Sequence, residues 1–317
     1  MALVWLPLPD AVQRMGGLPA GLRAEVWSGS GPWPDSVADV ELFVVPYMGG
    51  ASSLAPIAGM RSLRVVQTLT AGVDDVLPLV PAGVTLCNAR GVHDASTAEL
   101  AVALMLASLR GLPDFVLAQG EQRWAPSTRV SLADRTVLIV GYGSVGAAVE
   151  QRLAGFEVEV LRVARSPRDG VHGWADLPAL LPQADVVVLC VPLTEQTRGL
   201  VDAAFLAAMP DGALLVNVAR GPVVTTDALV AELSSGRLRA AVDVTDPEPL
   251  PVGHPLWGAP GLLLSPHVGG NSTAFLPRAY RLLADQLGRF AAGQPLLNVV
   301  RWPRSHPRPG AGEASVG

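Results

Sequence analysis

Three glycines that follow an apolar run restrict the fold of this chain more than any other feature. The segment VLIVGYGSVG places Gly141, Gly143 and Gly146 at the spacing G-x-G-x-x-G. The residues before them, Thr136–Val140, have the composition of a buried strand, and the residues after them, Ser144–Leu153, have a helical pattern. A strand, a glycine turn and a helix in this order form the dinucleotide-binding fingerprint of α/β folds. The glycines alone would also suit a turn without a ligand, so the flanking elements decide for a dinucleotide site.

Each glycine of this turn is expected to have its own task. Gly141 permits the tight turn, Gly143 lets the backbone approach a pyrophosphate, and Gly146 lets the helix pack closely on the strand. The N-terminus of the helix would then offer free backbone N–H groups to the phosphates.

The end of the next predicted strand indicates which dinucleotide is bound. The fingerprint expects an acidic residue about 20 positions further on, where it holds the ribose hydroxyls. In this chain Ala164 stands there, followed by Arg165 and Ser166. An arginine and a hydroxyl suit a 2′-phosphate, and the missing acid removes the repulsion of that phosphate. The sequence therefore predicts NADP(H) as the preferred cofactor and NAD(H) as the second choice, unless Arg165 and Arg168 are solvated surface residues.

Strand-like and helix-like segments alternate along the whole chain, which is typical of α/β folds with parallel sheets. A capping-box pattern predicts that a long apolar helix opens at Ser96, with Glu99 as the capping partner, and runs to about Leu109. A last amphipathic helix is predicted over residues 274–292. Besides Thr136–Val140, apolar strands are predicted at residues 40–46, 63–69, 84–88, 158–163, 185–191, 213–218, 240–244 and 262–264.

The composition excludes several classes of function. The chain has 317 residues, half of them hydrophobic, which is enough for two domains with cores. Its net charge of −5 gives no basic surface for nucleic acid. All its basic residues except histidine are arginines, so a Walker-A lysine and a Schiff-base lysine are excluded. No cluster of His, Cys and Asp has the spacing of metal ligands, so no metal is expected.

The sequence also indicates the cellular compartment of the protein. The apolar start, residues 2–8, lacks a basic leader and is not expected to act as a signal peptide. No apolar run reaches the length of a transmembrane helix, so no membrane contact is expected. Cys87 and Cys190 lie in apolar runs and are expected to be buried free thiols, which favours the cytoplasm. Residues 303–317 are rich in Pro, Gly and Ser, and disorder is expected there.

Polar residues that suit acid–base chemistry follow three apolar strands. The segments LLVNVARGP (214–222), AAVDVTDPEPLP (240–251) and LLLSPHVGG (262–270) contribute Arg220, Asp243, Glu248 and His267. In open α/β sheets the functional site lies at these strand ends. An arginine binds a carboxylate at two points, and a histidine exchanges a proton near neutral pH. A glutamate beside the histidine would favour its protonated form and fix its tautomer. Each residue alone has a structural explanation, and together they supply the anchoring cation and the proton donor that reduction of a 2-keto acid needs.

These segments together resemble the D-isomer-specific 2-hydroxyacid dehydrogenase family, which includes glyoxylate/hydroxypyruvate reductases and phosphoglycerate dehydrogenases. The similarity runs from about Gln67 to Leu297. Besides the glycine turn it covers Ala71-Gly72-Val73-Asp74, Ala98-Glu99, VPLTEQTRGL (191–200), Asn217–Gly221, Asp243-Val244, Glu248-Pro249 and Pro266-His267. The departure from the commonest family pattern, at Ala164-Arg165, affects the choice of cofactor. Because related enzymes that use formate lack the glutamate, Glu248 argues against that branch.

The resemblance implies a fold, an activity and a set of site residues. The fold would be two doubly wound parallel-sheet domains: a flavodoxin-like substrate domain (1–98 plus 283–317) and a Rossmann cofactor domain (99–282). The activity would be the reversible NAD(P)-dependent reduction of a small 2-keto acid to the D-2-hydroxy acid. A homodimer is expected from the resemblance alone.

Three residues would be catalytic: Arg220 as substrate anchor, His267 as acid/base and Glu248 as its partner. Backbone N–H groups at Ala71 and Gly72 would hold the substrate carboxylate. The cofactor residues would be Gly141, Gly143, Ser144, Val145, Gly146, Arg165, Ser166, Pro192, Thr197, Val218, Arg220, Asp243, His267 and Gly269.

Two other functions stay open at this point. A non-enzymic NAD(P)-sensing protein of the corepressor type would share the fold and even the catalytic residues, although the acidic, lysine-free composition disfavours it. A phosphite-type dehydrogenase would keep the same trio. The sequence leaves undecided whether Trp124 and His93 reach the site or only pack.

Overall fold

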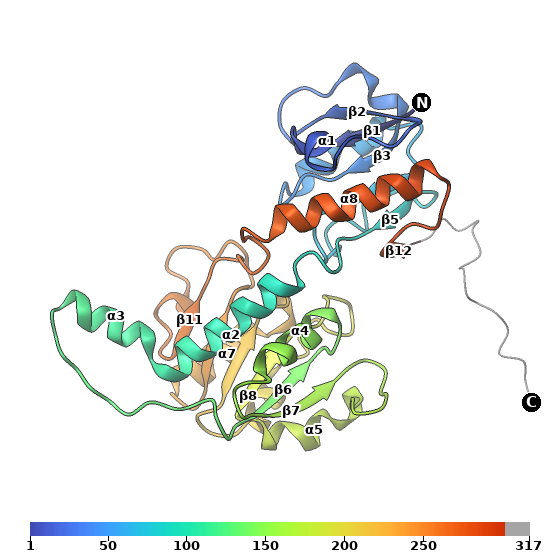
Figure 1. The fold of residues 1–317 in the computed structure, drawn as a ribbon. Coiled ribbons are helices and arrows are strands. Elements are labelled where there is room, and N and C mark those ends of the chain that lie inside the picture. The colour runs from blue at the N-terminus through green and yellow to red at the C-terminus, as the bar shows by residue number, and fades with distance from the viewer. Residues whose placement is uncertain (302–317) are drawn as a thin grey trace, which may run out of the picture. The chain divides into compact units, whose positions relative to one another are not determined.

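The computed structural model describes residues 1–301, so the disorder expected for residues 303–317 lies outside the described part. Two compact units are present within the described residues: Met1–Val92 together with residues 273–301, and His93–Ser272 (Figure 1). Each unit is built on its own six-stranded sheet. The predicted fold class, α/β with two doubly wound parallel-sheet domains, is confirmed.

The units meet along the chain at Val92/His93 and at Ser272/Thr273, whereas the sequence placed these boundaries near residues 98 and 283. The helices α2 (Asp94–Arg110) and α8 (Phe275–Ala291) explain the difference. Each helix packs its apolar side chains on the sheet of its own unit, α2 on the second and α8 on the first. The chain therefore crosses between units just outside the helices.

The first unit has a sheet of flavodoxin-like order, β2-β1-β3-β4-β5, with β12 added beside β5. All neighbouring strands are parallel except β12 and β5. The sequence predicted β3, β4 and β5 but missed the other three strands, including the apolar start of the chain, which is β1. The bounds are β1 Ala2–Leu6, β2 Leu22–Val26, β3 Val40–Val44, β4 Val65–Gln67, β5 Thr85–Cys87 and β12 Val299–Arg301.

The two faces of this first sheet are covered differently. On one face α8 and the short α1 (Ala11–Arg14) pack on the strands, and Figure 1 shows α8 beside β5 and β12. The other face is covered by irregular chain and the 3₁₀ helices η1 (Asp35–Asp39) and η2 (Ala51–Gly59). An aromatic cluster of Trp5, Trp27 and Phe43, with ring centroids 6.1–6.3 Å apart, fills that layer.

The second unit has a sheet whose neighbouring strands are all parallel, in the order β11-β10-β9-β8-β6-β7. All six strands were predicted from the sequence. The order reverses between β6 and β8, and at such a switch point the carboxyl ends of the strands open a binding crevice. The bounds are β6 Thr136–Val140, β7 Glu159–Val163, β8 Val186–Leu189, β9 Leu214–Asn217, β10 Arg239–Val242 and β11 Leu262–Leu264.

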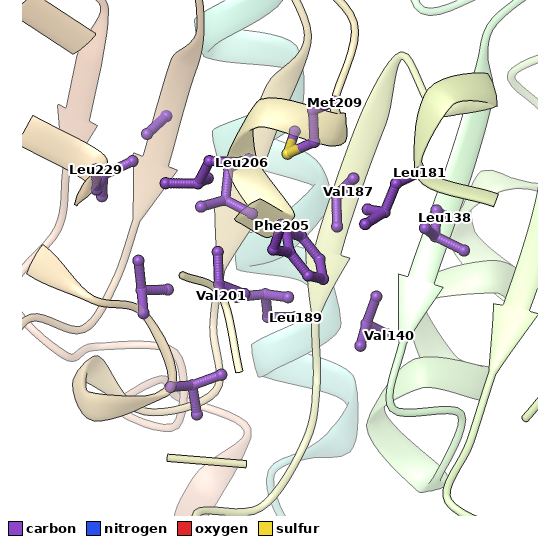
Figure 2. Close-up of a cluster of buried hydrophobic side chains, with 14 of the residues drawn as sticks. Leu138, Val140, Leu181, Val187, Leu189, Val201, Phe205, Leu206, Met209 and Leu229 are labelled. Atoms are coloured by element: carbon purple, nitrogen blue, oxygen red, sulfur yellow. The ribbon is translucent and has the colours of Figure 1, made fainter. Parts of the chain in front are cut away.

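Apolar side chains cover both faces of this second sheet, which is why its strands read as continuous apolar runs. On one face Leu138 and Val140 pack against α6 residues such as Phe205 (Figure 2). On the other face Val137 and Ile139 pack against α2 and α4. The remaining helices of the unit are α3 Leu112–Gly120, α4 Ser144–Leu153, α5 Leu177–Leu180, α6 Ala203–Ala208 and α7 Thr226–Ser234.

The start of α2 differs from the predicted capping box. The helix begins at Asp94, two residues before Ser96. Ser96 lies in the first turn, and its hydroxyl donates a hydrogen bond to the carbonyl of His93, at 3.1 Å. Because that hydroxyl bonds backward, it does not cap an N–H group, and Glu99 is exposed to solvent.

Among residues 1–301 no single helix is long and apolar enough to cross a membrane. Only α2 and α3 taken together pass that test of length and hydropathy, and they are bent by 66° at their junction.

Candidate functional site

The glycine turn joins β6 to α4 at the switch point of the second sheet. The N–H groups of Gly141 and Tyr142 both donate to the carbonyl of Val163, at 2.9 Å each, which ties the turn to the end of β7. In α4 the first N–H bonded back to the turn is that of Ala147, which donates to the Gly143 carbonyl at 3.0 Å. The preceding N–H groups, from Ser144 to Gly146, therefore point out of the helix end, as an anion-binding turn requires.

Two of the glycines are required by the fold itself. A Cβ on Gly141 would lie 2.6 Å from the backbone carbon of Cys190, and Gly141 has a φ of +106°. A Cβ on Gly146 would lie 2.5 Å from the carbonyl oxygen of Gly141. A Cβ on Gly143, in contrast, would meet no atom of residues 1–301 within 4 Å beyond those of its chain neighbours. Only Gly143 thus keeps space open for something other than the described protein.

Tyr142, the residue between the first two glycines, is held by a polar cluster. Its hydroxyl donates to Glu150, and Arg162 donates to both oxygens of the same carboxylate. The guanidinium groups of Arg162 and Arg168 lie 5.8 and 5.6 Å from the ring centroid of Tyr142. Hydrogen bonding from Arg162, helped by Tyr142, outweighs burial and holds the pKa of Glu150 below its ordinary value. This cluster fixes the turn against α4 and β7.

The chain after β7 presents the residues predicted to choose the cofactor. Ala164 is buried, whereas Arg165 and Ser166 are exposed. Arg168, two residues further, donates to the carbonyl of Tyr142 at 2.7 Å, so this segment is joined to the glycine turn. The predicted ribose-binding residues therefore lie next to the predicted phosphate-binding residues.

After β8 the two predicted cofactor residues differ in role. Pro192 is exposed at the strand end, but Thr197 is 1 % exposed. The hydroxyl of Thr197 donates to the carbonyl of Pro192 at 2.7 Å and accepts from the N–H of Thr194 at 2.8 Å. Thr197 thus shapes the turn from inside, while Pro192 forms its surface.

After β9 a turn presents Arg220, whose side chain is half-buried. The side chain of Asn217 builds this turn: its carbonyl oxygen accepts from Ala219, at 3.0 Å, and its amide donates to the Arg220 carbonyl, at 3.1 Å. Gly221 is needed next, because a Cβ there would lie 1.8 Å from the carbonyl oxygen of Thr245. Val218, predicted to contact cofactor, is 9 % exposed in the same turn.

After β10 the carboxylate of Asp243, which is 3 % exposed, organises the chain that follows β11. Its Oδ1 accepts from the Ser265 hydroxyl, at 2.6 Å, and from the N–H of Val268, at 2.9 Å. Its Oδ2 accepts from the N–H of Gly269, at 2.8 Å. Asp243 was predicted to bind a nicotinamide carboxamide, and Oδ2 retains a lone pair for that. Its contacts within the protein show a second role, which is to hold the loop of His267.

His267 is paired with Glu248 as predicted from the sequence. Nδ1 of His267 lies 2.5 Å from Oε1 of Glu248, with side-chain exposures of 28 % and 38 %. Burial opposes ionisation of Glu248, but the hydrogen bond and charge of His267, a bond from Thr245 and the charge of Arg220 outweigh it and lower its pKa. His267 has a φ of +53°, and its N–H donates to the carbonyl of Asp243, at 2.7 Å. The loop thus holds the backbone of His267 in a left-handed conformation, with Nδ1 of its ring against Glu248.

The predicted site residues of the second unit therefore gather at the carboxyl ends of its strands: the glycine turn after β6, and the trio predicted to be catalytic after β9, β10 and β11. Ala71 and Gly72, predicted to bind the substrate carboxylate, belong to the first unit. Their carbonyls accept hydrogen bonds from Asn88 and Thr70, both at 2.7 Å. Their own N–H groups donate to nothing within residues 1–301.

Sequence reasoning missed three residues that build the site: Asn217, Ser265 and Tyr142. The signal was present for Asn217 and Ser265, because a polar residue at the end of a buried strand needs a partner. Nothing in the sequence indicated the ring of Tyr142 between two arginines, since its partners come from other elements. Among residues 1–301 no group of three or more His, Cys, Asp and Glu side chains is arranged to hold a metal.

A glycine turn at the switch point of a parallel sheet, with a His–Glu pair and an arginine at neighbouring strand ends, defines the class of nicotinamide-dependent dehydrogenases. The family is given by comparison with known proteins. Residues 102–269 match the model of the "D-isomer specific 2-hydroxyacid dehydrogenase, NAD binding domain". The chain belongs to the D-isomer specific 2-hydroxyacid dehydrogenase family, as the resemblance predicted.

Known relatives cover nearly the whole chain. A glyoxylate reductase/hydroxypyruvate reductase of Mus musculus is 32 % identical over 308 residues, covering 89 % of this chain and 93 % of the relative. A D-isomer specific 2-hydroxyacid dehydrogenase from Xanthobacter autotrophicus Py2, solved in complex with NADPH and MES, is 33 % identical with a TM-score of 0.79, covering 96 % and 98 % of the two chains. An NADPH-dependent glyoxylate/hydroxypyruvate reductase from Sinorhizobium meliloti, solved with NADP and sulfate, is 26 % identical with a TM-score of 0.81, covering 95 % and 98 %.

Proposed function

We propose that this protein reduces a small 2-keto acid of the glyoxylate or hydroxypyruvate type to the D-2-hydroxy acid, with NADPH as the preferred reductant. The observation that carries the proposal is the His267–Glu248 pair, 2.5 Å apart, at the strand ends of the same sheet that bears the glycine turn. The names of the similar reductases support the class of substrate.

The glycine turn fits a dinucleotide. Space above Gly143 and the outward N–H groups of Ser144, Val145 and Gly146 suit a pyrophosphate. When bound, a reduced nicotinamide supplies a hydride. Asp243 would hold the carboxamide of that ring, and Pro192, Val218 and Gly269 would border it.

The preference for NADP(H) is supported by the chain after β7. No acidic residue stands at Ala164, and Arg165 and Ser166 are exposed beside the glycine turn. A guanidinium and a hydroxyl would bind the 2′-phosphate, which NADH lacks. Several similar structures are described as NADPH-dependent or were solved with NADP.

The proton would come from His267. Because Glu248 holds Nδ1, Nε2 is the ring atom that gives a proton to the carbonyl oxygen of the keto acid, which becomes the hydroxyl. The negative charge of Glu248 stabilises the imidazolium before the transfer. The guanidinium of Arg220 would bind the substrate carboxylate and polarise the carbonyl, and the N–H groups of Ala71 and Gly72 would bind the carboxylate as well.

The direct test is a steady-state assay that follows the absorbance of NADPH with glyoxylate and with hydroxypyruvate. We expect turnover of at least one of them and a higher kcat/KM with NADPH than with NADH. Tight nucleotide binding without turnover of any keto acid would instead favour a nucleotide-sensing protein. Reduction of NADP⁺ by phosphite in a second arm would favour a phosphite-type dehydrogenase.

The protein is further proposed to be a cytoplasmic homodimer. Free thiols at Cys87 and Cys190, whose pKa values burial raises to about 12, suit a reducing compartment. Exposed apolar side chains on and after α3, among them Val116, Leu117 and Trp124, are side chains that a second copy would cover. Size-exclusion chromatography with light scattering tests the oligomeric state, and a monomeric mass would refute the dimer.

A further inference from the structure

We propose that His93, which lies outside the trio, is a positioning residue for His267. Its ring Nδ1 lies 3.2 Å from the carbonyl oxygen of Gly270, in the loop that carries His267. This inference rests on the proposed acid–base role of His267. It assigns to His93 the task of keeping that loop in the geometry in which the imidazole meets Glu248.

The direction of this hydrogen bond is fixed by its acceptor. A carbonyl oxygen only accepts, so Nδ1 of His93 carries the proton and donates it. His93 is 6 % exposed and Gly270 is half-buried, so the bond is partly buried. A partly buried bond from a ring of fixed tautomer gives the Gly270 carbonyl one preferred position.

His93 is itself firmly held. It immediately precedes α2, and its carbonyl accepts from the N–H of Thr97, at 2.9 Å, and from the hydroxyl of Ser96, at 3.1 Å. The helix that follows is anchored in the core by buried residues such as Ala98, Ala101 and Met105. The donor to Gly270 is therefore part of a rigid element, which is the condition for positioning another group.

The loop from Ser265 to Gly270 is held from two sides. On the sheet side, Asp243 accepts hydrogen bonds from Ser265, Val268 and Gly269. On the side of α2, His93 donates to Gly270. His267 lies between these attachment points, and its backbone is in a left-handed conformation. The short loop therefore has little freedom to adjust, and a displacement of Gly270 also displaces the imidazole of His267.

Close packing of the 265–270 loop on α2 supports the proposed effect of His93 on the position of His267. A Cβ on Gly269 would lie 3.0 Å from Oδ2 of Asp243 and 3.5 Å from Cγ2 of Thr97. Gly269 is therefore confined between the carboxylate and the first turn of α2. The hydrogen bond of the next residue to His93 sets how deeply the loop sits in that space.

The bond also joins the two places where the chain enters and leaves the second unit. His93 is the first residue of the unit and Gly270 the third from its end. Their separation of 177 residues means that no local turn would bring them together. The entry and exit segments are thus fixed to each other beside the loop of the proposed acid.

Three substitutions of His93 distinguish loss of its hydrogen bond to Gly270 from loss of side-chain volume. His93→Asn puts an amide N–H near the place of Nδ1, His93→Gln puts one near the place of Nε2, and His93→Phe removes both donors with similar volume. We expect kcat to fall about tenfold in the Phe and Gln variants with little change of KM for NADPH, because a misplaced catalytic group lowers kcat. The Asn variant should recover most of the loss.

Ser96→Ala is the matched control. It removes a hydrogen bond to the carbonyl of His93 in the same helical turn and leaves the ring bond to Gly270 in place. Its kcat should stay at the wild-type value. If Ser96→Ala loses as much kcat as His93→Phe, fraying of α2 explains the loss and the positioning role is refuted.

A measurement that does not depend on turnover is hydrogen–deuterium exchange of the peptide that spans residues 265–272. Exchange there should be faster in the Phe and Gln variants than in the wild type and the Asn variant, with β6 unchanged. Wild-type exchange and wild-type kcat in His93→Phe would overturn the inference while leaving the proposed function intact. If the wild-type protein turns over no keto acid, the proposed function fails first, and the exchange data still report whether His93 holds the loop.

Discussion

The two halves of the carboxyl edge of the second sheet are built on opposite principles. Around β6, β7 and β8 the site depends on glycines, which have no side chain. The backbone around Gly141 and Gly146 has no room for a Cβ, and the space beside Gly143 is open. Around β9, β10 and β11 it depends on side chains that are bonded, with Asp243, Ser265 and Glu248 holding the loop and ring of His267. Substitutions that add atoms should therefore disrupt the first half, and substitutions that remove hydrogen bonds should disrupt the second half.

This difference predicts which measurable quantity each half controls. Changes in the glycine half should alter cofactor affinity, because the backbone of that half is the proposed site of the pyrophosphate. Changes in the bonded half should alter turnover and its pH dependence, because that half carries the proposed proton donor, His267. The following variants test that division, from the largest expected effect to the smallest.

The largest effect is expected for His267→Asn. Asparagine tolerates the left-handed φ of +53° better than most residues, so the loop should keep its form. An amide does not exchange a proton near neutral pH, and kcat should fall about a thousandfold. Isothermal titration should give nearly unchanged NADPH affinity. His254→Asn is the control, since that ring only accepts from the N–H of Leu256. Turnover close to the wild-type value in His267→Asn would remove the acid–base role.

A large effect on affinity is expected for Gly141→Ala, for a reason that Gly143→Ala does not share. At Gly141 the new Cβ would clash with the backbone of Cys190 at a φ of +106°, so the melting temperature without cofactor should fall together with a hundredfold or greater loss of NADPH affinity, about 2.7 kcal/mol or more. At Gly143 the Cβ meets no chain atom, so the melting temperature should stay and only the affinity should fall. Equal behaviour of the two variants would contradict the assignment of Gly143 to the pyrophosphate.

A moderate effect is expected for Arg165→Ala. Loss of a charge-assisted hydrogen bond to the 2′-phosphate should raise KM for NADPH by about tenfold, and KM for NADH should change little. Arg61→Ala, at an exposed arginine of the first unit, is the control. The same change of KM for both cofactors would show that Arg165 does not distinguish them.

A smaller effect, on the pH profile, is expected for Glu248→Gln. The neutral amide removes the carboxylate charge that lies against Nδ1 of His267, so the pH profile of keto-acid reduction should move to lower pH. The wild-type profile on the same buffers is the reference. An unshifted profile with normal kcat would mean that Glu248 does not assist His267.

The smallest effect concerns the cluster around Tyr142. Since hydrogen bonding lowers the pKa of Glu150 in the folded state, its contribution to stability is complete above the ordinary value of 4.5 and is lost as the pH falls through the lower folded value. Glu150→Gln should cost about 1 kcal/mol at pH 7, given the partial exposure of the pair. Thermal unfolding at pH 7 and pH 4 measures this. A destabilisation that is the same at both pH values would exclude the charge of Glu150 as its origin.

The sequence predicted the second sheet far better than the first. Strands such as Thr136–Val140 are long apolar runs followed by a turn signal, and both faces of that sheet are buried. β12 has three residues and pairs with β5 from the far end of the chain, so no local pattern indicates it. The first strand is hard to recognise because the apolar residues 2–8, at the very start of the chain, resemble the apolar part of a leader as much as a strand.

For the candidate site, too, the sequence predicts only what local patterns can indicate. Arg220, Glu248 and His267 stand out in the sequence because their residue types are unusual at those places and occur in family order. The hydrogen bonds of Asn217, the attachment of the loop to Asp243 and the link from His93 to Gly270 depend on residues 2 to 177 positions apart that only the folded sheet brings together. The candidate reactive residues could therefore be predicted from the sequence, whereas the hydrogen bonds that hold them in position could not.

The exposed residues after β7 have an evolutionary consequence. Within residues 1–301 the side chains of Arg165 and Ser166 form no hydrogen bond or ion pair, in contrast to the glycines, which the backbone confines. Replacing these two residues therefore breaks no side-chain hydrogen bond or ion pair within residues 1–301. Under the proposed role of Arg165 and Ser166, a lineage of such proteins can change its nicotinamide coenzyme by a few substitutions here, while the glycine turn and the trio stay the same.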